Sequence, residues 1–307
     1  MSTEGSTRAI IAALLANIGI AISKFIAAAF SGSASMLAEG IHSLADSGNQ
    51  VLLIIGGKRA KRVASAEHPF GYGRSRYIYA FVVSIVLFAV GGLFSINEGL
   101  SKLQHPHELE MAWLPLTVLA VAIVLESLSF RTAIIESNHI RGNQSWVQFI
   151  RRAKAPELPV ILLEDFAALI GLTLAFGGVG LTVLTGDAIW DAVGTLAIGV
   201  LLVLVAVVLG LETSSLLVGE GATAEDTTKI RKALAGSTGV VSIIHMKTLY
   251  LGPDELMVGA KIAIESTDGA ESIVKAIDDA EVAIRAAVPA ARVIYLEPDI
   301  LRVATKG

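Results

Sequence analysis

Six long apolar stretches constrain this 307-residue chain more than any other feature of its sequence. About 20 mostly apolar residues in a helix cross the hydrocarbon core of a bilayer. The charged fraction is 17%, against about 25% in soluble domains. The sequence therefore predicts an α-helical membrane protein whose six transmembrane helices cover residues 8–30, 35–56, 77–101, 112–136, 158–183 and 188–217.

After residue 218 the apolar runs shorten and charged residues become frequent. Turn, capping and alternation signals predict an αββαβ order in this tail, typical of a small ferredoxin-like α+β domain. The predicted elements are a helix over 224–236, strands over 240–250 and 255–265, a helix over 269–287 and a strand over 292–297. We therefore predict a transmembrane domain over 1–218 and an α+β domain over 219–307.

The loops predict an orientation in the membrane. Residues 57–76 and 141–157 are rich in lysine and arginine, whereas the loops around residues 31–33, 102–110 and 184–187 are short or poor in them. The positive-inside rule places basic loops in the cytoplasm. With six spans, both termini and the tail are then cytoplasmic too, as in a multi-pass protein of the plasma or inner membrane.

The chain contains no cysteine. Disulfides, thiolate metal sites and cysteine nucleophiles are therefore excluded, and histidine and carboxylates are left as the strong metal ligands. The net charge of −4 gives no sign of nucleic-acid binding.

The second apolar stretch carries a polar stripe made of Glu39, His42, Asp46 and Asn49. At 100° per residue, these side chains fall within about a quarter of a helix circumference. Each ionisable group in hydrocarbon costs roughly 2.5–3.5 kcal/mol, and such groups usually mark an ion or proton path. His42 and Asp46, four residues apart, form a compact pair of metal ligands. The competing interpretation is a buried His–Asp hydrogen bond that only locks helix packing.

The fifth stretch carries a second acidic feature, Glu164 and Asp165. Neighbouring residues on a helix diverge by about 100°, so both reach one site only at its edges. A nitrogen and carboxylate site without sulfur suits Zn²⁺, Mn²⁺, Fe²⁺, Co²⁺ or Ni²⁺. Because these ligands bind metal when deprotonated, exchange of metal for protons is physically natural.

The sequence resembles the cation diffusion facilitators, also called the cation efflux or zinc transporter family. The resemblance lies in Gly32-Ser33 through Asp46, in the loop motif His68-Pro-Phe-Gly-Tyr-Gly-Arg74, in Glu164-Asp165, and in six spans followed by an αββαβ tail. It implies a homodimeric exporter of divalent metal, Zn²⁺ first, that works by proton antiport and alternating access. It also implies His42, Asp46 and Asp165 as ligands, with no cofactor besides the transported metal, and a tail that dimerises.

The chain departs from this family at Ile161, where most members carry histidine four residues before the aspartate. It resembles the subgroup with Leu-Leu-Glu-Asp in the fifth span and Arg76-Tyr77 after the loop motif. The fourth ligand is then Glu164, Asn49 or water, and Glu39 is expected as a vestibule or helix-end charge.

Weaker candidates lie outside the spans. His68 is present in the loop motif, but Tyr72 replaces the second histidine of some members. In the tail, His245 and Glu297 match metal-binding positions, whereas Lys261 and Tyr295 stand where histidine would be expected, so at most weak binding is predicted there. Other polar residues of the spans are expected near span ends: Asn17, Lys24, Glu98, Glu126 and Asp191.

Two other function classes compete with transport. A membrane-anchored metal sensor would need a well-liganded tail, and this tail is poor in histidine. An intramembrane metal-dependent hydrolase would need an activated water on an open metal site, and the sequence has no HExxH or GxSxG motif. The sequence therefore favours a transporter that is not an enzyme, with the metal ion, protons, the lipid bilayer and a second copy of itself as partners.

Overall fold

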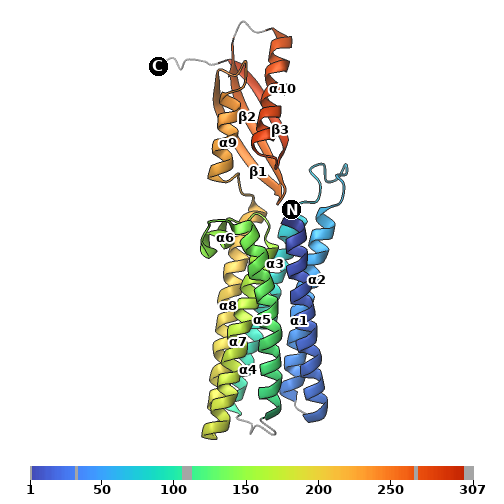
Figure 1. Ribbon diagram of the computed structural model, residues 1–307, viewed down its shortest axis with the longest axis vertical. Coiled ribbons are helices and arrows are strands. Elements are labelled where there is room, and N and C mark those ends of the chain that lie inside the picture. The colour runs from blue at the N-terminus through green and yellow to red at the C-terminus, as the bar shows by residue number, and fades with distance from the viewer. Residues whose placement is uncertain (1, 32–33, 106–112, 266–268, 301–307) are drawn as a thin grey trace. The chain divides into compact units, whose positions relative to one another are not determined.

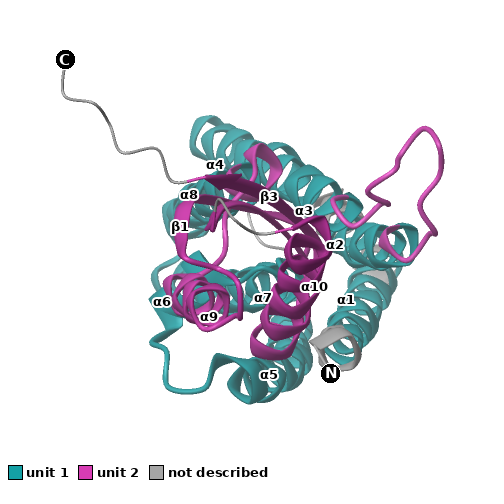
Figure 2. Ribbon diagram, turned by 90° about the horizontal axis from the view of Figure 1, so that it is seen from above, with its two compact units in different colours: residues 1–59, 75–214 teal, residues 60–74, 215–307 magenta. Residues whose placement is uncertain are grey.

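The computed structural model describes residues 2–31, 34–105, 113–265 and 269–300. In the first two helices only some of the side chains are described. The chain forms two compact units (Figure 2). The first contains residues 1–59 and 75–214, and the second contains residues 60–74 and 215–307. The sequence places the boundary at 218 and the loop 60–74 with the membrane helices, so the structure differs in assigning this loop to the second unit.

Long helices that lie side by side make up the first unit (Figure 1). They are α1 (Ser2–Ser31), α2 (Ala34–Ala60), α3 (Ser75–Val86), α4 (Phe94–Gln104), α5 (Trp113–Arg141), α7 (Glu157–Thr185) and α8 (Ile189–Val218), with a short α6 (Trp146–Arg152). A π-helical segment, η1 (Leu87–Leu93), joins α3 to α4 into one continuous rod. In the described part of the chain, each of the six predicted spans coincides with such a helix or rod, and the span predicted from residue 188 begins one residue before α8.

Five helical segments of the described residues are long and apolar enough to cross a membrane: 7–27, 75–104, 113–141, 157–185 and 189–218. Helix α2 has 27 residues but is not among them. Its polar stripe and the amides Asn49 and Gln50 lower its hydropathy. The second of the six predicted spans therefore remains a prediction.

Glycines bring the third and sixth predicted spans into backbone contact. A Cβ atom on Gly92 would lie 2.6 Å from Cγ2 of Val203, and one on Gly199 would lie 2.7 Å from the backbone nitrogen of Ile96. Real Cβ atoms do not approach this closely, so only glycine fits at these two positions. Small residues at helix interfaces allow this close packing in membranes.

A buried ion pair joins the first turns of α3 and α7. Nε and Nη2 of Arg76 donate hydrogen bonds to the two carboxylate oxygens of Glu157, the second at 2.9 Å. Arg76 is 7% exposed and Glu157 is 2% exposed. In the sequence Arg76 reads as one more charge of a basic loop, but in the structure its charge is neutralised within the helix bundle.

The second unit has the predicted αββαβ order. Its elements are α9 (Ala224–Ala235), β1 (Ser242–Gly252), β2 (Glu255–Ile264), α10 (Ala270–Ala287) and β3 (Ala291–Ile300). The sheet order is β1-β2-β3, antiparallel between β1 and β2 and parallel between β2 and β3. Ile230 of α9 and Ile284 of α10 share one core with alternate residues of β2, so both helices cover the same face. The predicted α+β fold is confirmed.

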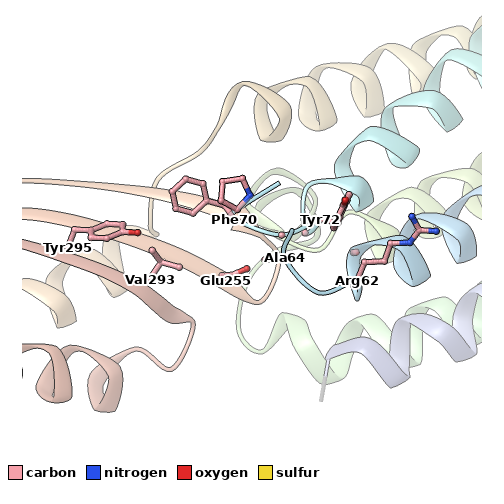
Figure 3. Close-up of a pocket in the computed structure, with 11 residues that line it drawn as sticks. Arg62, Ala64, Phe70, Tyr72, Glu255, Val293 and Tyr295 are labelled. Atoms are coloured by element: carbon pink, nitrogen blue, oxygen red, sulfur yellow. The ribbon is translucent and has the colours of Figure 1, made fainter. Parts of the chain in front are cut away.

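The loop 60–74 packs within this second unit. A Cβ atom on Gly73 would lie 2.7 Å from the carbonyl oxygen of Leu251, so the two backbones touch. Between the loop and the sheet lies a cavity of about 370 Å³ lined by Arg62, Phe70, Tyr72, Glu255 and Tyr295 among others (Figure 3).

Candidate metal centre

The acidic motif of α7 meets the polar stripe of α2 inside the helix bundle. Both carboxylate oxygens of Glu164 accept hydrogen bonds, from Nδ2 of Asn49 at 2.8 Å and from Nε2 of Gln50 at 3.0 Å. Glu164 is 6% exposed, and the two amide residues are 1% and 0% exposed. The structure thus brings together the two sequence segments in which the ligands are predicted.

Asp165 points to a different helix from its neighbour. Oγ of Ser129, on α5, donates a hydrogen bond of 2.7 Å to Oδ2 of Asp165. The side chain of Glu126, one turn earlier on α5, is also hydrogen-bonded to Asp165. Adjacent helix positions diverge by about 100°, so Glu164 is bound by α2 while Asp165 is bound by α5.

Two buried charges differ from the sequence expectation. Lys24 and Glu126 are expected near span ends, yet they are 4% and 2% exposed. Nζ of Lys24 donates a 2.9 Å hydrogen bond to Oγ of Ser43 on α2, and its charge acts on Glu126. The expectation is wrong for Glu126 because this acid lies in the middle of α5. Its central place in an apolar helix is the signal that could have identified it.

The remaining stripe residues are described only in part. Asp46 is half-buried on α2, and its charge acts on both Glu164 and Glu126. Glu39 and His42 belong to α2, but their side chains lie outside the described residues. Among the side chains that are described, no three of His, Asp and Glu form a group that could hold a metal ion.

Ile161 stands where the resemblance leads us to expect histidine, and its side chain is packed in the apolar core. It lies one turn before Asp165, is 0% exposed, and belongs to the apolar core of the bundle. No hydrogen-bonding or metal-binding group can come from this side chain.

The weaker candidates lie on exposed surfaces of the second unit. His68 stacks on Tyr72 with 4.5 Å between ring centres. His245 pairs with Lys261 across the sheet, and Lys261 pairs with Glu297. Nζ of Lys261 lies 3.0 Å from Glu297 and 3.1 Å from Asp299. These hydrogen bonds, Glu297 first, raise the pKa of Lys261. A protonated ammonium has no lone pair for a metal, so Lys261 holds Glu297 instead.

Comparison with known proteins identifies the family of this chain. The family model of the cation efflux transmembrane domain matches residues 10–218. The chain belongs to the cation efflux family. Members of this family are transporters rather than enzymes. The apolar helices described above are those of a multi-pass membrane protein.

Three related proteins are similar in sequence to most of this chain. A protein named proton-coupled zinc antiporter SLC30A9, mitochondrial, is 31% identical over 265 residues in Xenopus laevis and over 244 residues in Homo sapiens, covering 85% and 78% of this chain. Metal tolerance protein C4 of Arabidopsis thaliana is 28% identical over 267 residues, or 85% of this chain. The matched regions are 47%, 42% and 58% of those three proteins, so the chain spans about half their length.

Proposed function

We propose that this cation efflux protein exports Zn²⁺, or a similar divalent ion such as Mn²⁺, Fe²⁺ or Co²⁺, in exchange for protons. The cation occupies a site between α2 and α7 and is exposed to each side of the membrane in turn. His42, Asp46 and Asp165 are the proposed ligands, with Glu164 as the candidate fourth ligand. The proposed oligomer is a homodimer in which the tails pair.

The observation that carries this proposal is the contact between α2 and α7. Asn49, which belongs to the polar stripe, and its neighbour Gln50 donate hydrogen bonds from α2 to Glu164 of α7. This contact supports a site between the two helices. Carboxylate and amide groups do not gather in an apolar bundle for packing, because leucine packs there at lower cost. The relatives named as proton-coupled zinc antiporters support the choice of zinc and protons for the proposal.

Metal uptake into inside-out vesicles tests this proposal. Wild-type protein is expected to take up Zn²⁺ when a proton gradient is imposed, and collapse of the gradient is expected to stop uptake. Asp46→Ala and Asp165→Ala are expected to lose uptake, because each removes a charged ligand. Glu136→Gln, on α5 but paired with His139, is the matched control. Wild-type uptake by both alanine variants would overturn the site assignment.

The fourth ligand is tested by two further variants. Glu164→Gln keeps the shape of the side chain but removes the carboxylate, whereas Ile161→His restores the nitrogen ligand usual in the family. If Glu164 binds the metal, the glutamine variant loses transport. Unchanged transport by Glu164→Gln would remove this residue from the ligand set.

The proposed location is the plasma or inner membrane with both termini in the cytoplasm. The basic loops 57–76 and 141–157 support this orientation through the positive-inside rule. The SLC30A9 relatives carry the word mitochondrial in their names, so an internal membrane is the alternative that a localisation experiment would distinguish.

A further inference from the structure

Among the described residues of the bundle, the buried acid Glu126 has no role in a site formed by α2 and α7 alone. Glu126 lies in the middle of α5, at 2% exposure, and α5 packs against both α1 and α7. A carboxyl group at this depth is costly unless it has a function or a partner. Its hydrogen-bonded partner is Asp165, a proposed ligand.

The surroundings of Glu126 carry an excess of acids. Among the described residues, the carboxyl groups of Asp165, Asp46 and Glu164 lie close enough to act on it, and so does the ammonium group of Lys24. The hydrogen bond between Glu126 and Asp165 needs a proton on one of the two carboxyl groups, because an ionised carboxylate is only an acceptor. A bound divalent cation can take the place of that proton by binding both carboxylates.

A second observation also indicates a cation nearby. Oδ1 of Asn49 and Oε1 of Gln50 are buried, and within the described part of the chain neither has a hydrogen-bond partner. Their amide nitrogens already donate to Glu164, so the carbonyl oxygens belong to the same cluster. Buried carbonyl oxygens without donors are costly, and a cation is one partner that satisfies them.

We propose that Glu126 supplies a further carboxylate to the cation site, so that α5 forms a third wall beside α2 and α7. This inference rests on the proposed transport function and deepens it. The helix α5 presents Ser129 and Glu126 to Asp165 from consecutive turns. Ser129 positions Asp165, whereas Glu126 adds negative charge and an oxygen ligand.

The alternative is that Glu126 only positions Asp165 through their hydrogen bond. Two substitutions separate these roles. Glu126→Gln keeps a side chain that can donate a hydrogen bond to Asp165 but removes the carboxylate, and Glu126→Asp keeps the carboxylate on a shorter side chain. If Glu126 is a ligand, metal binding is weakened more in the glutamine variant than in the aspartate variant. If Glu126 only positions Asp165, metal binding is weakened more in the aspartate variant.

The test is Zn²⁺ titration of the purified full-length protein by calorimetry, together with the visible absorption of bound Co²⁺. We expect Glu126→Gln to weaken Zn²⁺ binding at least about tenfold, the range that loss of a supporting group already produces at metal sites, and to shift the Co²⁺ bands. Glu126→Asp is expected to bind more tightly than Glu126→Gln. Glu136→Gln, the same change elsewhere on α5, should bind as wild type does.

Each outcome decides the inference. Wild-type affinity in Glu126→Gln, or weaker binding by Glu126→Asp than by Glu126→Gln, would overturn it. Weaker Zn²⁺ binding with unchanged Co²⁺ bands would also overturn it, because a distant charge alters affinity without entering the ligand shell. Asp165→Ala in the same titration separates this from the wider proposal: if Asp165→Ala binds as wild type does, the proposed function fails and not only the role of Glu126.

Discussion

At the scale of single residues, Arg76 and Glu157 form a buried ion pair in the helix bundle outside the candidate site. The guanidinium meets the carboxylate through two hydrogen bonds, which is the strong bidentate form of an ion pair. Removing one partner of a buried pair leaves an uncompensated charge, whereas removing both need not destabilise the fold.

Glu157→Gln is therefore expected to lower the stability of the bundle by about 3–5 kcal/mol. The double variant Arg76→Met with Glu157→Leu should be less destabilised than the sum of its two single variants, because no charge stays buried alone. Thermal unfolding in detergent measures both. Strict additivity of the two single effects would contradict a direct coupling between these side chains.

Tyr250 gives the second unit a pH dependence. Burial, and to a smaller extent the charge of Asp226, raise the pKa of Tyr250 to about 12. In the unfolded chain tyrosine ionises near 10. Between about pH 10 and 12 the unfolded state therefore releases a proton that the folded state keeps, and stability falls as the pH rises.

We expect the apparent unfolding temperature of the full chain to fall more steeply above pH 10 in wild type than in Tyr250→Phe. Circular dichroism at several pH values measures this difference. Tyr295, which is 60% exposed, provides the control, since Tyr295→Phe should follow wild type. An identical slope in Tyr250→Phe would show that this hydroxyl is not the group that titrates.

At the scale of elements, glycines determine how closely the third and sixth predicted spans approach. Gly92 and Gly199 each face side-chain or backbone atoms that leave no room for a methyl group. The π-helical segment η1 (Leu87–Leu93) contains Gly92. The close contact between η1, α4 and α8 therefore depends on glycine, which has no side chain, at these two positions.

Gly199→Val is expected to destabilise the bundle by about 1–3 kcal/mol, the usual cost of overpacking a filled interior. Gly177→Ala, where a Cβ atom would meet nothing within 4 Å, should be neutral or stabilising by up to about 1 kcal/mol through helix propensity. Thermal unfolding of both variants tests the pair. Equal stability of Gly199→Val and wild type would mean that α8 can shift away from Ile96.

At the scale of the whole molecule, the distribution of charge predicts which loops share one side of the membrane. The basic loops around Ser65 and Ser145 are predicted on the cytoplasmic side, and the turn at Asp187 on the opposite side. These three residues are exposed in the structure. The chain contains no cysteine, so any introduced thiol is the single labelled group.

Ser65→Cys and Ser145→Cys are expected to react with a membrane-impermeant maleimide in inside-out vesicles, and Asp187→Cys in intact cells. Labelling of all three from the same side would contradict both the orientation and the parity of the spans. Reaction after detergent treatment confirms that each thiol is accessible in principle.

The sequence by itself determined where helices form and which segments carry chemistry. Apolar runs of bilayer length become helices because the backbone must satisfy its own hydrogen bonds in hydrocarbon. Five of the predicted spans are such helices in the described residues, and α2 is helical although its polar residues leave its crossing of the membrane a prediction. The αββαβ order of the tail follows from signals that act over a few residues, such as the Thr223 cap that accepts a hydrogen bond from the backbone of Asp226. The segments around Asp46 and Asp165 were likewise identified by the cost of charge in an apolar helix.

Only the tertiary structure decided which of these acids meet. Glu164 faces the amides of α2 and Asp165 faces α5 because of how each helix is rotated in the bundle, and rotation depends on contacts between residues far apart in the chain. For the same reason the sequence does not indicate a partner for Glu126, which in the structure is hydrogen-bonded to Asp165. In the sequence Arg76 is one charge among many in a basic loop. In the structure it forms a buried ion pair with Glu157, which is 81 residues away in the chain.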